Sequence, residues 1–254
     1  MCGIVGVVAQ RDVTPLLLDG LRRLEYRGYD SAGVALQTGS GQLERVRTVG
    51  KVAELARVLE QSPVSGSTGI AHTRWATHGA PSEQNAHPHV CHEHVAVVHN
   101  GIIENHDELR SLQREAGYRF TSQTDTEVIV HQIHHYLDQG QDLLAAVQST
   151  VGDLEGAFAL GVISREEPGR LVAARRGSPL VIGIADGERL IASDVAALVS
   201  ETCNFIFMED GDVADILHDS LTIYTPSGIV VERPVKKSMV TADATDKGEY
   251  AHYM

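Results

Sequence analysis

The chain of 254 residues is long enough for one large domain or two small ones, and its 43% hydrophobic content is ordinary for a globular protein with a sizeable core. A formal net charge of −13 argues against broad binding to the phosphate backbone of nucleic acids. The three cysteines, Cys2, Cys91 and Cys203, are odd in number and widely spaced, so we expect no disulfide framework and a reducing, cytoplasmic location. Because no run approaches about 18 apolar residues, we expect no association with membranes.

The first half of the chain is predicted to alternate strands with amphipathic helices. Residues 2–9 are rich in Val and Ile, which is typical of a buried strand. Thr14 followed by Pro15 predicts the start of a helix, which Gly28 ends. Turn residues at 39–41 predict a hairpin. The other predicted segments are strands at 31–37, 43–49, 69–75 and 94–99, helices at 52–60, 105–116, from 124 and at 141–150, and a long loop at 77–93.

From residue 155 onward, short β-rich runs alternate with Gly, Pro and Asp turns, which predicts antiparallel sheet. The predicted strands are 156–164, 170–175, 180–185, 189–193, 204–208, 212–217 and 220–225. The whole chain is therefore predicted to be α+β, with layered sheets covered by helices. We expect one domain over residues 1–240, followed by a polar linker at 241–254. Two of the predicted helices begin at segments that resemble capping boxes, Asn105 with Glu108 and Thr124 with Glu127.

Cys2 is the first residue along the chain that could take part in catalysis. Removal of Met1 would leave Cys2 with both a thiol and a free α-amine, whose pKa of roughly 7.7 to 8.0 suits a general base near neutral pH. A terminal amine that activates its own side chain is an established nucleophile arrangement, and it requires no histidine partner. The alternative is a buried strand cysteine without chemistry.

Asn100 and Gly101 follow the apolar strand predicted at 94–99. The Asn100 side-chain amide and the Gly101 backbone N–H can donate to the same point, which would form an oxyanion hole. The alternative is a plain Asn-Gly hairpin turn. The residues that follow predict a helix and not a matching return strand, which favours the oxyanion hole.

Arg74 and Asp125 together suggest an amino-acid site. An Arg at a strand end can bind a carboxylate through two parallel hydrogen bonds, and an Asp facing the same pocket can bind an ammonium group. Thr77 and His78 add polar groups beside Arg74, next to Trp75, the only tryptophan. Each of these residues also has a structural interpretation, such as a core Trp beside a surface Arg, or an Asp that complements a helix dipole.

Five segments, in order along almost the whole chain, carry a resemblance to a known family. They are residues 1–6 (MCGIVG), 24–33 (LEYRGYDSAG), 72–79 (HTRWATHG), 99–105 (HNGIIEN) and 124–127 (TDTE). The chain closely resembles the glutaminase domains of glutamine–fructose-6-phosphate aminotransferases, which are class II, N-terminal nucleophile glutamine amidotransferases. Each segment alone is modest evidence, whereas five in the expected order are specific.

The resemblance implies a fold and a set of roles. The fold would be the four-layer αββα sandwich of N-terminal nucleophile hydrolases, with two stacked, mainly antiparallel sheets. Cys2 would be the nucleophile, and Asn100 with the Gly101 amide would hold the oxyanion. The residues that would line the glutamine site are Arg74, Thr77, His78, Gly101 and Asp125. Arg27 would lie near the nucleophile, and Trp75 would gate the passage of ammonia.

The resemblance also implies partners. The substrate would be L-glutamine, and the released ammonia would pass to a sugar-isomerase domain that converts fructose 6-phosphate to glucosamine 6-phosphate. We expect that domain to be absent from this chain, since residues 246–254 resemble the connection into it. A homodimer would form through the full-length enzyme. We expect no cofactor, no metal ion and no nucleic-acid or membrane partner.

Three other interpretations stay open. His87, His89, Cys91, His92 and His94 are metal-ligand types, but their spacing interrupts the alternation of an extended chain and no second pair is evident, which disfavours structural zinc. A non-catalytic amino-acid-binding domain would keep the pocket without the reaction. Another amide hydrolase of the same fold would prefer a substrate other than glutamine.

Overall fold

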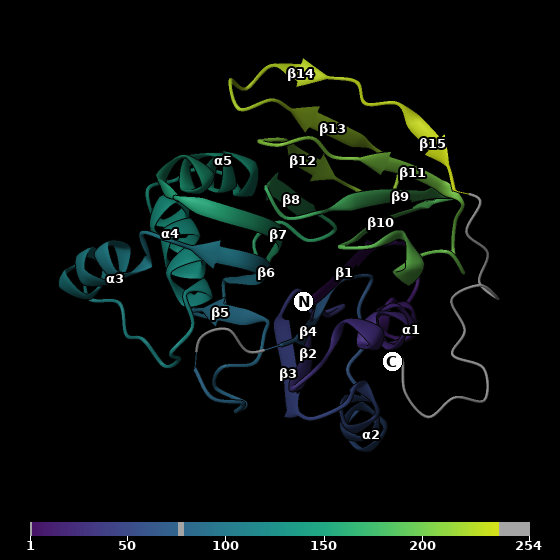
Figure 1. The fold of residues 1–254 in the computed structure, drawn as a ribbon, viewed down its shortest axis with the longest axis horizontal. Coiled ribbons are helices and arrows are strands. Elements are labelled where there is room, and N and C mark those ends of the chain that lie inside the picture. The colour runs from purple at the N-terminus through teal and green to yellow at the C-terminus, as the bar shows by residue number, and fades with distance from the viewer. Residues whose placement is uncertain (1, 76–78, 239–254) are drawn as a thin grey trace.

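Two antiparallel sheets lie face to face in the computed structural model, which describes residues 2–75 and 79–238. Helices cover the outer face of each sheet (Figure 1). Within the described ranges every strand pairing is antiparallel. The predicted α+β class and the antiparallel sheets are therefore confirmed.

The first sheet has eight strands in the order β15-β11-β9-β10-β1-β4-β2-β3. Their bounds are β15 (Val235–Lys237), β11 (Asn204–Phe207), β9 (Val181–Ala185), β10 (Glu188–Ala192), β1 (Gly3–Val8), β4 (Thr68–Arg74), β2 (Ser31–Gln37) and β3 (Leu43–Val49). The second sheet has seven strands in the order β14-β13-β12-β8-β7-β6-β5. Their bounds are β14 (Val230–Val231), β13 (Leu221–Tyr224), β12 (Val213–Ile216), β8 (Leu171–Arg176), β7 (Gly156–Ser164), β6 (Val95–Ile103) and β5 (His89–Cys91).

Five α-helices and two short 3-10 helices are present in the described residues. They are α1 (Thr14–Leu24), η1 (Glu25–Arg27), α2 (Val52–Gln61), α3 (His106–Glu115), α4 (Thr126–Asp138), α5 (Leu143–Asp153) and η2 (Val195–Ala197). Helix α1 begins at the predicted Thr14-Pro15 pair, because proline is tolerated where the helix has no backbone acceptor for its N–H.

The four layers are separated by three apolar cores. Strand β1 contributes to two of them, because successive side chains of a strand point to opposite faces. Val5 and Val7 pack with Leu17 of α1, whereas Ile4 and Val8 belong to the core between the two sheets. On the far side of the second sheet, Leu160 of β7 packs with apolar residues of α4 and α5. This confirms the expected αββα sandwich.

Strand β6 is longer than predicted. The predicted strand ended at residue 99, but β6 continues to Ile103, so Asn100 and Gly101 lie inside a strand and pair with Ala159 and Phe158 of β7. The Asn-Gly turn is therefore excluded, because hydrogen bonding to β7 outweighs the local turn preference. A short strand, β5, lies within the predicted loop at 77–93.

Both predicted capping boxes are wrong. Asn105 precedes α3 without capping it. Its side-chain amide instead donates to the Asp153 carbonyl oxygen at 2.8 Å. Helix α4 follows Asp125, and the Glu127 carboxylate accepts backbone N–H bonds from Thr121 and Ser122 at 2.8 and 2.7 Å. The carboxylate thus fixes the segment that leads into α4.

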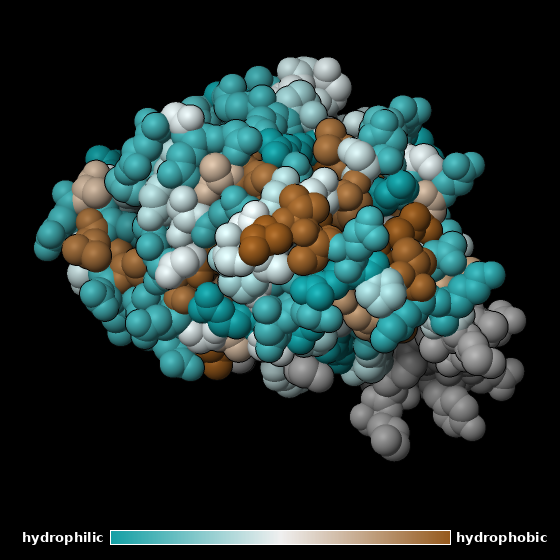
Figure 2. Space-filling model, turned by 90° about the horizontal axis from the view of Figure 1, so that it is seen from above, coloured by the Kyte–Doolittle hydropathy of each residue, from teal (hydrophilic) through white to brown (hydrophobic). Residues whose placement is uncertain are grey.

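The surface carries exposed apolar side chains near the C-terminal strands. Ile229, Val230 and Val235 are each more than half exposed. Figure 2 shows the molecule from above, with hydrophobic residues gathered across the middle of this face. The described residues end at 238, so the predicted linker at 241–254 lies outside them. Among the described residues, no helix combines the length and apolar character needed to cross a lipid bilayer.

Candidate active site

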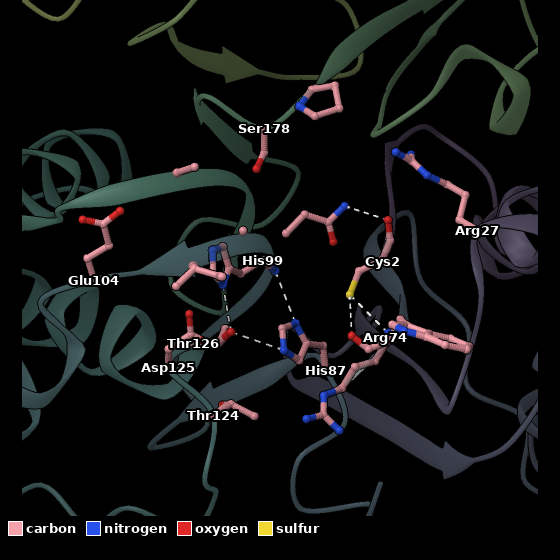
Figure 3. A pocket seen from close by; sticks show the side chains of 16 residues that line it. Cys2, Arg27, Arg74, His87, His99, Glu104, Thr124, Asp125, Thr126 and Ser178 are labelled. Atoms are coloured by element: carbon pink, nitrogen blue, oxygen red, sulfur yellow. Dashed lines mark hydrogen bonds between the residues drawn. The ribbon is translucent and has the colours of Figure 1, made fainter. Parts of the chain in front are cut away.

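A cavity of about 510 Å³ opens beside the start of β1. Its walls come from segments far apart in sequence: the residue before β1, η1, the end of β4, the middle of β6 and the start of α4 (Figure 3). Of the residues expected at or beside the glutamine site, those that line the cavity are Cys2, Arg27, Arg74, Trp75, Asn100, Gly101 and Asp125. Thr77 and His78 lie outside the described residues.

The Cys2 thiol is held by backbone groups. Among the described residues, the hydrogen-bond partners of Cys2 Sγ are both atoms of Trp75: the backbone N–H donates to the sulfur at 3.2 Å, and the thiol donates to the carbonyl oxygen at 3.4 Å. Burial raises the pKa of the Cys2 thiol, and the Trp75 N–H opposes that shift. The thiol is therefore protonated at neutral pH, and a nucleophilic role requires a base.

Asn100 has its side-chain amide fixed at both ends. Nδ2 donates to the Cys2 carbonyl oxygen at 3.1 Å, and Oδ1 lies 3.0 Å from Nε2 of His72. The same Nε2 lies 3.0 Å from the His99 carbonyl oxygen. Because both partners of Nε2 are acceptors, that nitrogen carries the proton. Burial lowers the pKa of His72 to about 3, so the imidazole is neutral and donates to Asn100.

Gly101 occupies a position that only glycine fits. Its φ of +137° is in the region that L side chains rarely adopt, and a Cβ here would lie 1.9 Å from the Ala157 carbonyl oxygen. The lack of a side chain lets β6 approach β7 closely while the Gly101 backbone faces the cavity.

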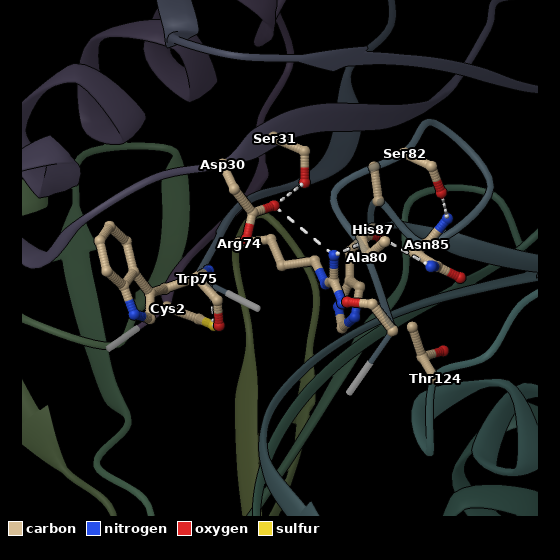
Figure 4. Close-up of polar contacts among 12 residues, drawn as sticks. Cys2, Asp30, Ser31, Arg74, Trp75, Ala80, Ser82, Asn85, His87 and Thr124 are labelled. Carbon is tan, nitrogen blue, oxygen red and sulfur yellow. Dashed lines mark hydrogen bonds and ion pairs between the residues drawn. The ribbon is translucent and has the colours of Figure 1, made fainter. Parts of the chain in front are cut away.

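Arg74 ends β4 and is only 4% exposed. Figure 4 shows its guanidinium between Asp30 and the loop at Ala80. Nη1 lies 3.5 Å from Oδ1 of Asp30, and Nη2 donates to the Gly79 carbonyl oxygen at 3.1 Å. These contacts hold a buried positive charge at the cavity wall.

Asp125 precedes α4, is 5% exposed and makes no side-chain cap with the helix. Its Oδ2 accepts the Ile103 N–H at 2.9 Å. Asp125 thus carries its carboxylate at the cavity wall, on the side opposite Cys2 in the view of Figure 3. The cavity therefore has an acidic group on one wall and the Arg74 guanidinium on another.

Arg27 and Trp75 flank the cysteine. Arg27 of η1 donates to the Ser193 carbonyl and hydroxyl oxygens at 3.2 and 3.1 Å. Trp75 is 53% exposed, and its ring passes over Gly28, where a Cβ would lie 2.3 Å from the ring. The glycine at this position is therefore required by the close approach of the indole.

Sequence reasoning assigned no role at this site to several of its buried residues. His72 is the donor to Asn100, His87 stacks on His72 with ring centroids 4.1 Å apart, and the Thr126 hydroxyl lies 2.9 Å from Nδ1 of His99. His72 shares a strand face with Arg74, since the two are two residues apart on β4. The alternation of side chains along β4 could have placed His72 on the same face as Arg74. It could not have predicted the contact with Asn100, because Asn100 lies in the other sheet.

Comparison with known proteins identifies the family of this chain. The profile of a family described as the glutamine amidotransferase domain matches residues 72–200. The chain belongs to this family of glutamine amidotransferase domains.

Two curated relatives are glutamine–fructose-6-phosphate aminotransferases (isomerizing). The protein from Shewanella oneidensis is 59% identical over 254 residues, and that from Pseudomonas syringae pv. tomato is 56% identical. In both cases the match covers all of this chain and 42% of the relative. The chain thus spans less than half the length of these relatives.

A solved structure shares the fold. Glutamine phosphoribosylpyrophosphate amidotransferase from B. subtilis superposes with a TM-score of 0.77 at 24% sequence identity, covering 90% of this chain and 50% of that one. The four-layer fold of this chain is therefore shared with that amidotransferase.

Proposed function

We propose that this chain hydrolyses L-glutamine to glutamate and ammonia through a γ-glutamyl thioester on Cys2. The observation that carries the proposal is the meeting of Cys2, the Asn100 amide and two opposite charges, Arg74 and Asp125, around one cavity. Each group comes from a different element, so their convergence is a property of the fold.

The base for the reaction is the α-amine of Cys2 after removal of Met1. Burial keeps the thiol protonated, and the hydrogen-bond partners of Sγ in the described part of the chain are backbone groups. An amine with a pKa of roughly 7.7 to 8.0 is partly unprotonated near neutral pH and can take the thiol proton. The sulfur then attacks the side-chain amide carbon of glutamine.

The tetrahedral intermediate places a negative charge on the former amide oxygen. We assign its stabilisation to the Asn100 Nδ2–H and the Gly101 N–H, since preorganised donors aimed at a developing oxyanion lower the barrier without reorganising. The Cys2 ammonium returns its proton to the departing ammonia, which leaves the thioester. Water activated by the same amine then releases glutamate and frees the thiol.

The charged ends of glutamine are assigned to the two charged walls. Arg74 binds the α-carboxylate and Asp125 the α-ammonium, which fixes the side-chain amide relative to Cys2. Thr77 and His78 complete the carboxylate side in this proposal.

The ammonia is proposed to serve a second reaction. The longer relatives are named for the transfer to fructose 6-phosphate, so we assign to a full-length protein the conversion of fructose 6-phosphate to glucosamine 6-phosphate in a sugar-isomerase domain. Trp75, exposed beside Cys2, is proposed as the gate for ammonia, with Arg27 supporting the nucleophile. The three free cysteines support a cytoplasmic location.

The test is the intact mass of the purified chain after incubation with a diazoketone analogue of glutamine. The expected result is loss of Met1 and a single adduct, which peptide mapping places on Cys2. Cys2→Ala should release no glutamate from glutamine, whereas Cys203→Ala, a change at an exposed cysteine away from the cavity, should leave the rate unchanged. Active protein that retains Met1, or hydrolysis that survives Cys2→Ala, contradicts the proposal.

Binding of glutamine and turnover of several amides separate the competing interpretations. A binding domain without catalysis would bind glutamine in the cavity but release no glutamate. A different amide hydrolase would turn over asparagine or acyl amides faster than glutamine.

A further inference from the structure

A second group of chemically active side chains lies away from the cavity, where the β5–β6 hairpin meets α4 (Figure 1). Cys91 ends β5, His92 follows it in the turn, and His134 projects from α4. One ligand atom from each of the three lies within 4.8 Å of the others. None of the three lines the cavity described above.

The spacing of the nitrogen atoms fits a metal ion. Nδ1 of His92 lies 3.2 Å from Nε2 of His134. Tetrahedral zinc with Zn–N bonds of roughly 2.0 to 2.1 Å holds two nitrogen ligands roughly 3.3 Å apart, and a Zn–S bond of roughly 2.3 Å places sulfur roughly 3.6 Å from each nitrogen. One thiolate and two imidazoles are also the ligand types that zinc prefers.

The surroundings orient these ligands. Nδ1 of His134 lies 3.0 Å from the Tyr118 hydroxyl and 3.3 Å from the Asp138 carboxylate. A carboxylate that accepts Nδ1–H leaves Nε2 unprotonated and directed at the metal position, which is the usual outer-shell arrangement of zinc-binding histidines. On the other side, Nδ1 of His131 lies 3.2 Å from Cys91 Sγ, where an N–H can donate to a thiolate.

The turn itself has an unusual backbone. His92 and Glu93 have φ angles of +49° and +61°, and the His94 N–H donates to the Cys91 carbonyl oxygen at 2.9 Å. A β-turn in which both central residues have positive φ angles normally contains Asn and Gly, which adopt this conformation at low cost. Strained residues of this kind concentrate at functional sites. Here the turn directs His92 toward α4.

We propose that Cys91, His92 and His134 bind one Zn²⁺ ion, with a water molecule as the fourth ligand. The site joins the β5–β6 hairpin to α4, the helix whose first turn follows Asp125. The alternative is an N–H···N hydrogen bond between the two imidazoles without a metal. The spacing of the cluster and the absence of an evident second pair in the sequence disfavoured zinc. In the fold, α4 brings His134 to His92 from 42 residues away.

The proposal is tested by titrating chelator-treated full chain with Zn²⁺ in a calorimeter, and with Co²⁺ while recording the absorption spectrum. We expect one ion per chain, a thiolate-to-cobalt band in the near ultraviolet, and a higher melting temperature with Zn²⁺. His92→Asn, a change in an exposed turn residue, should weaken binding at least tenfold, and Cys91→Ser should abolish the thiolate band. Cys2→Ala should bind the ion like the parent chain, which separates this site from the proposed catalytic cysteine.

His135→Asn is the matched control, because His135 is adjacent to His134 but its ring contacts Gln139 at 2.7 Å. It should bind Zn²⁺ like the parent chain. Circular dichroism of the metal-free variants identifies any loss of fold. If Cys91→Ser unfolds, Zn²⁺ binding by His92→Asn still tests the proposal. The proposal is overturned if the parent chain binds no Zn²⁺, if folded His92→Asn binds it unchanged, or if Cys2→Ala removes binding.

Discussion

The Asn100 side-chain amide is held by hydrogen bonds at both ends, so it is oriented before any substrate binds. Asn100→Ala should lower kcat for glutamine hydrolysis about 100- to 1000-fold, the effect of removing one oxyanion donor. KM should change little, because the donor acts on charge that develops only in the transition state. Steady-state glutamate release measures both. Asn204→Ala, on β11, is the control, and a raised KM with an unchanged kcat would refute the assignment.

His72 is predicted to act through Asn100 as a positioning residue. His72→Leu removes the donor to Oδ1 and should lower kcat with little change in KM, whereas His72→Gln keeps an N–H donor and should restore a large part of the rate. The pH profile of kcat/KM between pH 5 and 8 should keep its shape in His72→Gln, because the buried imidazole, with a pKa of about 3, does not titrate in that range. Equal losses in both variants would indicate a purely structural role.

The sequence predicted those site residues whose chemistry is visible in their own segment. Cys2 was identifiable from its position after Met1, and Asn100 from the donors it shares with Gly101. His72 and Thr126 were missed because their roles depend on contacts with β6, which lies in the other sheet from His72. Alternation on a strand predicts which face a residue occupies, but not what lies opposite that face.

Asp125, the residue before α4, supplies the negative wall of the cavity, and the isosteric change Asp125→Asn tests that contribution. The amide oxygen can still accept the Ile103 N–H, so the fold should be preserved while the charge is lost. We expect KM for glutamine to rise about 10- to 100-fold, the value of a hydrogen bond between charged groups, with a smaller change in kcat.

The measurement for Asp125→Asn is the ratio of kcat/KM for glutamine to kcat/KM for an analogue that lacks the α-amine. The parent chain should prefer glutamine strongly, and Asp125→Asn should lose most of that preference. Asp107→Asn, an exposed aspartate in the first turn of α3, should behave like the parent chain. An unchanged preference in Asp125→Asn would remove Asp125 from the substrate site.

At the level of elements, periodicity predicted most helices and strands, and the failures share a cause. Strand β6 passes through an Asn-Gly pair because β7 supplies backbone partners for it. The capping boxes failed because Asn105 and Glu127 bond to other segments. Local propensity is a weak guide wherever tertiary hydrogen bonds compete with it. The order of the strands in the sheets could not be predicted from the sequence either, since β1 lies between β4 and β10, which is distant in sequence.

The whole molecule should lose stability in mild acid because several histidines are buried and neutral. Burial lowers the pKa of His72 from 6.5 to about 3 and holds those of His87 and His89 well below the ordinary value. Between pH 6.5 and 3 the unfolded chain therefore binds protons that the folded chain does not. The stability contribution is complete above pH 6.5 and declines as the pH falls, by about 2 kcal/mol for His72 at pH 5.

Urea unfolding at pH 7 and pH 5 measures this effect. The parent chain should have a lower free energy of unfolding at pH 5, and His72→Gln should reduce the difference between the two pH values by about 2 kcal/mol. Asn204→Ala, a change at a side chain that does not titrate, should leave the difference unchanged. A parent chain that is equally stable at both pH values would show that these histidines bind protons in the folded state.

This chain is expected to perform only the ammonia-releasing part of the reaction. The chain covers 42% of the length of its curated relatives. The groups that line the cavity suit an amino acid, and we assign none of them to a sugar phosphate. Ammonia release and amino-sugar formation should therefore separate. The purified chain should release glutamate from glutamine at the same rate with or without fructose 6-phosphate, and mass spectrometry should detect no glucosamine 6-phosphate. Amino sugar formed by the parent chain but not by Cys2→Ala would show that the acceptor site lies within these 254 residues.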